Sequence, residues 1–550
     1  MKKRILKVIS AVLAIAMLAG CGGQGGAKPE GAQNNGAPKA VDKIVTLGVS
    51  GTPDLDPAVA TSGSSIIAMI NMYDTLVYPG EDGMEGRLAE KWESSDDGLT
   101  YTFHLKKGVK FHNGEEVKAS DVAFSMNRMI AIGEGYAYLY EDAVQEAKAI
   151  DDYTVEFKLK RTFGPFVSTL IRLAIISEKD VMANKKDGPY GEYGDYGKAY
   201  LTTTDAGSGA YKAKELVQQD YFYAEKNPDW FFGWKSEKAP EGFKMMAITE
   251  ASTVRTMINN GELDITDQWQ SAESLAAMDK IDGVSIAQFS TFLMYNMYYN
   301  TQLAPMDDVN YRRAISCLID YDMICNSILI GSKPATGPVS ANVRGHVDTS
   351  TFKFDPEKAK EYLAKSKYAD TYKDYPIEIV CNSDVADLEK IALMIQSAAS
   401  QIGITVEISK APWVSIVDRA GSKETTPHMM AINSAPSYDE AGSYLESRYH
   451  SKTAGTWEQC EWLENDKVDK MIEDSLATVD EGERFKKYAD IQKYIADELC
   501  PTGYLCDLTE RAAYQSATLK WNAIENAKDG EISSALYGYL HVFSDMEIIG

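Results

Sequence analysis

A strand–helix–strand pattern in the second half of the chain restricts the possible folds more than any other feature. Ile377–Val380 has the composition of a buried strand, and so does Ile404–Ile408. Between them, Gly403 ends a segment whose apolar residues recur at helical spacing, at Leu388, Ile391, Ile395 and Ile402. Short connections of this kind form a βαβ unit, in which the two strands are parallel. The sequence therefore predicts a parallel sheet in this region and an α/β fold.

An earlier segment has the period of antiparallel strands. Apolar and polar residues alternate from Leu99 to Phe111 around a Lys107-Gly108 turn signal, which predicts a β-hairpin. Ser120 is then expected to cap a helix with one apolar face, formed by Val122, Met126, Met129 and Ile130. Alternation from Tyr153 to Leu159 predicts another strand, and Asp355-Pro356 is expected to open a helix farther on. We therefore expect a mixed α/β chain with an antiparallel-rich insertion.

The N-terminus has the layout of a secretory signal. Four basic residues within the first seven precede an apolar stretch that ends in Leu18-Ala19-Gly20-Cys21. This stretch is too short to cross a bilayer comfortably, so residues 1–20 are the predicted signal peptide. The small residues before the cysteine resemble the bacterial lipobox, which makes Cys21 the predicted site of lipidation. Residues 22–41 contain no aromatic side chain and little that could build a core, so residues 21–42 are expected to form a lipidated, flexible tether.

Size and charge limit the function of the rest of the chain. The 550 residues are enough for more than one hydrophobic core, and no later segment has the length and apolarity of a transmembrane helix. The formal net charge of −25 would repel phosphates, so no nucleic-acid partner is expected. The cysteines after Cys21 lack the CxxC spacing of a zinc site. Cys500 and Cys506 could pair outside the cell or remain buried free thiols, and the sequence leaves both alternatives open.

The motifs of common enzymes and metal sites do not occur. There is no HExxH, GxSxG or GxxxxGK[ST] pattern, and His104 and His112 lie across the predicted hairpin without an obvious shared metal site. The charged run from Glu461 to Asp474 is interpreted as a solvated helix face. We therefore predict a binding protein rather than an enzyme, with no catalytic residue, no metal site and no cofactor.

One long segment carries a family resemblance. Leu88–Met129 resembles the signature region of the bacterial extracellular solute-binding proteins of family 5, which are oligopeptide-, dipeptide- and nickel-binding lipoproteins of ABC importers. Shorter segments follow in the order of that family, at Leu55-Asp56-Pro57-Ala58, Gly207-Ser208-Gly209-Ala210-Tyr211, Asn227-Pro228-Asp229-Trp230-Phe231, Gly261-Glu262-Leu263-Asp264-Ile265, Tyr311-Arg312-Arg313-Ala314-Ile315 and Phe354-Asp355-Pro356-Glu357-Lys358-Ala359. The resemblance covers nearly the whole chain after the tether.

This resemblance implies a fold. We expect a two-lobed periplasmic-binding-protein-like fold of type II, the large peptide-binding class, with an extra inserted α+β domain. Lobe I would comprise residues 43–79, 200–288 and 505–550, the inserted domain residues 80–199, and lobe II residues 289–504. A small ligand, oligopeptide- or dipeptide-like by family, would lie between two lobes that close by a hinge.

The resemblance also implies a function. The chain would be the substrate-binding lipoprotein of an ABC importer, a monomer held outside the cytoplasm by a lipid anchor in the cell membrane. It would deliver its ligand to separate permease and ATPase subunits. Two alternatives share these sequence features. One is the same fold with a non-peptide ligand, such as an oligosaccharide or a nickel chelate, and the other is a ligand-sensing receptor.

Matching to the family places candidate ligand-binding residues in several parts of the chain. A loop after Leu55 would offer backbone and hydroxyl groups at Ser62, Gly63 and Ser64. Trp413 would line the cleft. An aromatic wall is expected from Tyr136, Tyr138 and Tyr140, because tyrosine combines apolar area with a polar tip.

The chain departs from the family where the α-amino group of a peptide would bind. Peptide binders carry an aspartate seven residues before an aromatic–leucine pair, and with Tyr444-Leu445 as that pair the position holds Ser437. A hydroxyl cannot neutralise a buried ammonium, and Asp439, two residues away, could serve instead if the loop is shifted. A family arginine position holds Ala431, and Arg419 is the nearest basic candidate. The sequence therefore leaves open a modified peptide, a sugar or a metal chelate as the ligand.

Overall fold

The computed structural model describes residues 43–80, 83–248, 250–349, 352–383, 385–524, 536 and 538–549. The predicted signal peptide, Cys21 and the predicted tether lie outside the described residues. Within those ranges, no helix has both the length and the apolar character needed to cross a membrane.

The first sheet contains four strands in the order β1-β10-β9-β8. These strands are β1 (Ile44–Val49), β8 (Tyr211–Val217), β9 (Tyr221–Lys226) and β10 (Gly242–Ala247). β1 is parallel to β10, whereas β9 is antiparallel to both of its neighbours. The sheet shares an apolar core with helix α1 (Gly63–Met72), and helices α6 (Ala251–Asn260) and α7 (Ala272–Met278) form a smaller core of their own.

A second sheet lies where the sequence predicts an antiparallel insertion, with the strand order β4-β5-β7-β6. Its strands, all antiparallel, are β4 (Ala89–Ser94), β5 (Thr100–Leu105), β6 (Val144–Asp151) and β7 (Thr154–Leu159). Helix α2 (Ala119–Ile132) packs on β6 and β7. The remaining elements of this part are the paired strands β2 (Val77–Gly80) and β3 (Gly83–Gly86) and the short helices α3 (Phe166–Thr169), α4 (Glu178–Asn184) and α5 (Lys198–Leu201).

The predicted hairpin from Leu99 to Phe111 is wrong. β5 ends at Leu105, and its two edges are already paired with β4 and β7. Because no free edge remains beside β5, the chain cannot return as its partner. Val109 and Phe111 are buried in the core of this part instead of continuing a strand.

The start of helix α2 also differs from the prediction. The helix begins at Ala119, so Ser120 is its second residue and not its cap. The capping contact comes from Asp121, whose carboxylate accepts a hydrogen bond from the backbone N–H of Lys118 at 2.9 Å. The predicted apolar face is present, because Val122, Met126 and Met129 are buried. The strand predicted from Tyr153 to Leu159 is confirmed as β7.

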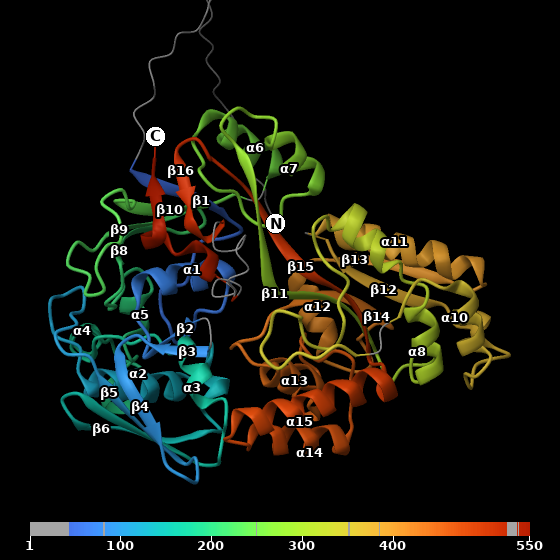
Figure 1. The fold of residues 1–550 in the computed structure, drawn as a ribbon, viewed down its shortest axis with the longest axis horizontal. Helices are drawn as coiled ribbons and strands as arrows, with labels where there is room; N and C mark the ends of the chain where they lie inside the picture. The colour runs from blue at the N-terminus through green and yellow to red at the C-terminus, as the bar shows by residue number, and fades with distance from the viewer. Residues whose placement is uncertain are drawn as a thin grey trace, which may run out of the picture. The chain divides into compact units, whose positions relative to one another are not determined.

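The third sheet contains the predicted βαβ unit, which is confirmed. Its strand order is β13-β12-β14-β11-β15, with β11 (Ser285–Tyr299), β12 (Ile377–Asn382), β13 (Val406–Ala411), β14 (Met429–Ser434) and β15 (Thr502–Tyr514). Helix α11 (Ala386–Gln401) connects the parallel strands β12 and β13 (Figure 1). Gly403 has a φ of +87°, a left-handed conformation that favours glycine, which explains why the helix ends there.

β11 and β15 connect the first and third sheets. They pair along most of their length, with register shifts on the way, and Figure 1 shows them running side by side. Ile265 forms one bridge to Leu47 in β1 and another to Tyr514 at the end of β15. The predicted boundaries at residues 288/289 and 504/505 fall within these two strands, so the chain crosses between the two parts on paired extended segments.

The other helices surround the third sheet and its connections. They are α8 (Val309–Ser316), α9 (Tyr321–Met323), α10 (Pro356–Leu363), α12 (Trp413–Ala420), α13 (Ala441–Tyr449), α14 (Asp466–Leu476) and α15 (Glu481–Tyr494), and a last strand pair is β16 (Leu519–Trp521) with β17 (Met546–Ile548). The helix predicted at Asp355-Pro356 is confirmed as α10, since the Asp355 carboxylate accepts a hydrogen bond from the Lys358 backbone N–H at 2.9 Å.

The predicted solvated face from Glu461 to Asp474 is wrong at its first residue. Glu461 is fully buried, and its carboxylate accepts a hydrogen bond from the Thr502 hydroxyl at 2.9 Å. It precedes α14, which starts only at Asp466, so it does not share the exposed side of that helix. Burial is the main reason that the pKa of Glu461 is raised to about 8.

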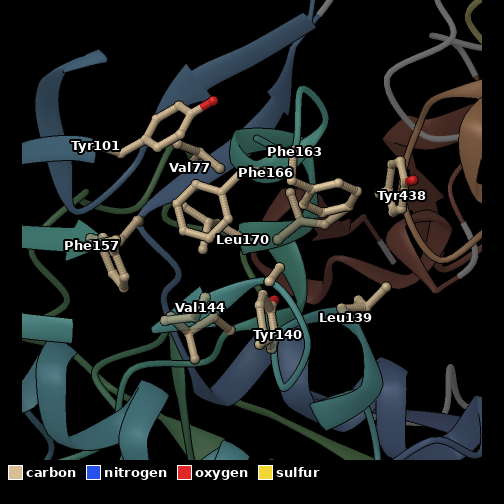
Figure 2. Packing of buried hydrophobic residues seen from close by; sticks show 14 of the residues in the cluster. Val77, Tyr101, Leu139, Tyr140, Val144, Phe157, Phe163, Phe166, Leu170 and Tyr438 are labelled. Atoms are coloured by element: carbon tan, nitrogen blue, oxygen red, sulfur yellow. The ribbon is translucent and has the colours of Figure 1, made fainter. Parts of the chain in front are cut away.

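The largest apolar core joins the inserted sheet to helices α13–α15. Phe103, Phe157 and Phe166 from the insertion belong to the same buried cluster as Tyr438 and Tyr444. Figure 2 shows Tyr438 on the side of this core where Phe163 and Leu139 lie. The inserted part and helices α13–α15 therefore share one apolar core, although they are far apart in the sequence.

The structure resolves the alternatives that the sequence leaves open for Cys500 and Cys506. Cys500 and Cys506 are buried free thiols, as are the other cysteines of the described ranges. No group of histidine, cysteine, aspartate or glutamate side chains in the described part of the chain is arranged to hold a metal ion.

Candidate functional site

The loop before helix α1 is held by a buried ion pair. Asp56 is 3% exposed and Arg128 is 1% exposed. The guanidinium donates from Nη1 and Nη2 to the two carboxylate oxygens, at 2.7 and 2.6 Å, and from Nε to the Tyr196 carbonyl at 2.7 Å. The carboxylate also accepts from the backbone N–H of Ala58 at 3.0 Å. A bidentate pair of this kind fixes the path of the loop relative to helix α2.

Ser62, Gly63 and Ser64 follow this loop at the start of α1. Ser62 is the N-cap, and its exposed hydroxyl accepts a hydrogen bond from the Ser65 backbone N–H at 3.2 Å. Ser64 is buried, and its hydroxyl lies 3.2 Å from that of Ser62. The Ser62 hydroxyl therefore caps helix α1, which is the ordinary role of a serine at this position.

A second polar group joins the inserted part to the segment after β14. The Tyr138 and Ser437 hydroxyls lie 2.5 Å apart, although 299 residues separate them in the chain. Arg172 donates from Nε to the Ser437 carbonyl at 2.7 Å, and its guanidinium lies 5.0 Å from the centre of the Tyr136 ring. Three of the predicted site residues, Tyr136, Tyr138 and Ser437, therefore converge around Arg172.

Two cavities adjoin this group. Tyr138 and Ser437 line a cavity with a volume of about 490 Å³, together with Ser447 and Glu458. Tyr136 and Arg172 line a smaller one of about 40 Å³ beside helix α1. Ile66 and Pro57 line the small cavity as well, so the loop and first turn of α1 lie close to the same group. Of the predicted aromatic wall, Tyr140 is buried and bonds to the Thr169 carbonyl instead.

Asp439 does not lie with Ser437 at the larger cavity. Its carboxylate accepts a hydrogen bond from the Arg344 backbone N–H at 3.1 Å, and it is absent from the cavity lining. Burial is the largest effect on this group and raises its pKa to about 6. In this arrangement Asp439 is two residues from Ser437 in sequence but faces a different part of the structure.

Trp413 and Arg419 lie on helix α12, away from the Tyr138–Ser437 contact. The Trp413 ring packs edge-on against Trp457, with 5.3 Å between the ring centres. Arg419 forms an ion pair of 2.7 Å with Glu378 of β12, and neither residue lines the larger cavity. Arg419 therefore has a partner within the protein, and its contact fixes α12 to the sheet.

A third cavity, of about 70 Å³, lies beside strands β11 and β15 of the third sheet. Trp269, Tyr295 and Glu510 are among the residues that line it. Glu510 is 5% exposed, and burial, with a smaller effect of the neighbouring Asp267, raises its pKa to about 8. Burial also raises the pKa of Asp267, which accepts a hydrogen bond from the Gln270 side chain at 2.8 Å. Acidic and aromatic side chains thus meet beside the strands that connect the two parts.

Among the residues that line the two cavities, Arg172 and Glu458 were not predicted from the sequence. A signal for Arg172 was present, because it is the one charged residue in the apolar run Leu170–Ile176. Glu458 lies within a polar stretch and carries no such signal.

Comparisons with known proteins agree with this architecture. The model of the bacterial extracellular solute-binding proteins, family 5 (middle region), matches residues 83–456, which is more than half of the chain. The probable D,D-dipeptide-binding periplasmic protein DdpA of Escherichia coli (strain K12) is 28% identical over 466 residues, which cover 83% of this chain and 87% of that protein.

Two solved structures share the fold. One is the ABC transporter-associated periplasmic binding protein DppA from Helicobacter pylori with the peptide STSA, at 23% identity, with a TM-score of 0.75 and coverage of 92% and 98% of the two chains. The other is the ABC transporter substrate-binding protein CtaP from Listeria monocytogenes, at 21% identity, with a TM-score of 0.78 and coverage of 92% and 99%. They confirm the predicted fold class, the type II periplasmic-binding-protein-like α/β fold. With the family model matched across most of the body, the chain belongs to the bacterial extracellular solute-binding proteins of family 5.

Proposed function

We propose that this chain is the substrate-binding lipoprotein of an ABC importer and that its ligand is a short peptide. Membership of family 5 supports the binding role. The peptide assignment is supported by the names of relatives, since DdpA is described as a probable D,D-dipeptide-binding protein and the Helicobacter pylori DppA structure contains the peptide STSA. No group in the proposed mechanism needs to break a covalent bond.

The observation that carries this proposal is the contact of Tyr138 and Arg172 with Ser437 beside the 490 Å³ cavity. Two distant segments of the chain meet there through polar groups that line this cavity. Arg172 reaches the Ser437 carbonyl with a charged donor, which is stronger than a neutral one. A ligand in this cavity would touch both segments at once and so stabilise their approach.

Capture would follow from movement about β11 and β15. In our proposal, residues 43–79, 200–288 and 505–550 form lobe I, residues 80–199 the inserted domain, and residues 289–504 lobe II. Paired strands can bend at their register shifts, one of which lies between Ser290 and Met294. A ligand that binds the closed arrangement more tightly shifts the population towards it, and a permease can distinguish the two surfaces.

We further propose that Cys21 carries the lipid, that the protein acts as a monomer outside the cytoplasm, and that permease and ATPase subunits are its partners. A diacylated cysteine supplies about 0.8 kcal/mol per buried methylene, enough to hold a protein on a membrane. The tether predicted for residues 21–42 would give the folded part reach above the lipid.

Thermal-shift measurements on the purified protein test this function. The ligand panel contains tripeptides, the same tripeptides with acetylated amino termini, oligosaccharides and nickel–histidine complexes. A ligand that binds only the native state at 100 times its Kd adds about 2.7 kcal/mol to the free energy of unfolding. Stabilisation by peptides supports the proposal, whereas stabilisation by sugars or nickel complexes alone would overturn the peptide assignment.

A further inference from the structure

Arg172 is a nearly buried cation without a counter-ion. Its side chain is 8% exposed, and Nε donates a hydrogen bond to the Ser437 carbonyl at 2.7 Å. Nη1 and Nη2 form no hydrogen bond or ion pair with the residues that the structure describes. A neutral carbonyl does not balance the positive charge, and charges removed from water are normally paired. The outer edge of this guanidinium is therefore free to bind an acceptor.

Arg172 lines the cavity of about 40 Å³ beside helix α1. Several residues of its wall, among them Ile70, Tyr78 and Tyr136, are only half-buried, so the cavity is not sealed inside an apolar core. One water molecule needs about 10–15 Å³ of such a volume, so there is room for roughly three heavy atoms. That is the size of a carboxylate group and too small for a whole amino acid.

The wall of this cavity carries one unbalanced charge. Its charged side chains are Arg172, Arg87 and Asp74. Asp74 pairs with Arg87 at 2.9 Å, and its other oxygen accepts a hydrogen bond from the Ser208 hydroxyl at 2.9 Å. The guanidinium of Arg87 also packs 3.9 Å from the centre of the Phe232 ring. The positive charge of Arg172 is left over, so the wall matches an occupant with a single negative charge.

Tyrosine hydroxyls add uncharged donors to the same wall. Tyr136 and Tyr539 line the cavity, and their hydroxyls form no hydrogen bond with the described residues. Burial raises the pKa of Tyr539 to about 12, whereas the charges of Arg172 and Arg87 act in the opposite direction. The Tyr539 hydroxyl is therefore protonated near pH 7 and can donate, and the Arg172 charge acts on this part of the wall.

We propose that the cavity beside α1 binds a carboxylate group, which accepts hydrogen bonds from Nη1 and Nη2 of Arg172 and from the Tyr539 hydroxyl. Two N–H donors at the edge of a guanidinium match the two oxygens of a carboxylate in geometry as well as in charge. The bound carboxylate supplies the counter-ion that the chain itself does not give to Arg172.

The carboxylate has two possible sources. One is the C-terminal end of a peptide ligand, and in that case the inference rests on the proposed function. Tyr136 of the small cavity and Tyr138 of the 490 Å³ cavity have ring centres 6.3 Å apart, so the two spaces are neighbours. The other source is a free small monocarboxylate, whose binding does not depend on the peptide assignment.

Calorimetric titration of the purified full-length protein with Ala-Ala-Ala and its C-terminal amide tests the first source. The two peptides differ only in the terminal charge. We expect the wild-type protein to bind the free acid on the order of tenfold more tightly, as charge-assisted hydrogen bonds predict.

Thermal unfolding in sodium propionate and in propionamide, with ionic strength held equal by sodium chloride, tests the second source. Propionamide has the shape of propionate without its charge. A free carboxylate that binds the native state should raise the Tm to a plateau, whereas propionamide should leave it unchanged.

Variants assign the effect to the small cavity. Arg172→Gln should abolish any preference for a carboxylate over the matching amide. Tyr539→Phe removes one hydroxyl without touching the Ser437 contact and should reduce that preference several-fold, so it still decides the matter if Arg172→Gln fails to fold. The control is Arg255→Gln, which removes an exposed arginine on α6 and should change nothing. Arg161→Gln tests the larger cavity, which Arg161 lines.

The outcomes separate this inference from the proposed function. Equal binding of the two peptides, together with no specific effect of propionate, would overturn the inference and leave peptide binding intact. A carboxylate preference that survives Arg172→Gln or Tyr539→Phe, or that is lost in Arg161→Gln, would also overturn it. If neither peptide binds but propionate stabilises the wild type and not Arg172→Gln, the inference stands and the peptide assignment fails.

Discussion

Replacing Asp56 by asparagine tests whether the buried ion pair holds the loop before α1. The change keeps the shape of the side chain but removes its charge. Arg128 is 1% exposed and directs two of its three hydrogen bonds to Asp56, so its charge would lose its counter-ion without gaining water. Removal of one member of a buried pair typically costs about 3–5 kcal/mol. We expect the free energy of unfolding to fall by that amount.

The expected thermal shift is small in degrees because the protein is large. With about 2.1 cal/mol/K of unfolding entropy per residue, roughly 500 folded residues give an entropy near 1 kcal/mol/K, so the loss corresponds to a Tm decrease of about 3–5 °C if unfolding is cooperative. Urea unfolding followed by circular dichroism measures the free energy directly. The double variant Asp56→Ala/Arg128→Met should recover part of the loss, because no charge is then left buried.

A matched control distinguishes burial from ion pairing itself. Glu361 and Lys358 form an exposed ion pair of 2.6 Å, the same length as the shortest Arg128–Asp56 contact. Glu361→Gln should cost less than about 1 kcal/mol, since exposed pairs contribute little. A cost below about 1 kcal/mol for Asp56→Asn as well would refute the reasoning, because it would mean that Arg128 regains solvation within the folded state.

Three further predictions concern acidity, closure and thiols. Glu461 has a folded-state pKa of about 8, against 4.5 for an ordinary glutamate. The protonated side chain therefore contributes its full stability below pH 4.5, and this contribution is lost as the pH rises to about 8. Glu461→Gln should flatten this part of the curve of unfolding free energy against pH. Arg172→Lys keeps the charge but removes the Nε donor to the Ser437 carbonyl, so stopped-flow measurements should show faster release of a bound peptide, and an unchanged rate would argue against a role in closure. Cys500 and Cys506 are buried free thiols, so both should resist a thiol reagent in the native protein and react after denaturation without reductant.

Several helices and strands of this fold can be predicted from the sequence, because they depend on residues that are neighbours in the chain. The βαβ unit from β12 to β13 follows from helical spacing between two apolar strands, with Gly403 at a left-handed position. The helix at Asp355-Pro356 follows from a capping carboxylate and a proline that needs no N–H partner. The hairpin predicted up to Phe111 is wrong because strand pairing depends on which edges are free, and both edges of β5 are occupied by β4 and β7.

The site depends on contacts that no local pattern contains. Tyr138 and Ser437 are 299 residues apart, yet their hydroxyls meet at 2.5 Å. Asp439 was one candidate ammonium partner in the sequence, and its carboxylate accepts a hydrogen bond from the Arg344 backbone N–H and does not line the cavity. The direction of each side chain is set by how the segment after β14 packs on α13–α15, and that packing is tertiary.

What the sequence by itself determined is the class of protein. The ordered family segments indicate a solute-binding protein and the hydrophobic period indicates α/β architecture, since both signals are carried by residues close together in the chain, whereas the lipid anchor at Cys21 stays a prediction. Only the tertiary structure decided which charges meet the cavity. Arg172 meets Ser437, and Ser437 meets Tyr138, because segments far apart in the chain pack together, and sequence spacing does not reveal such contacts.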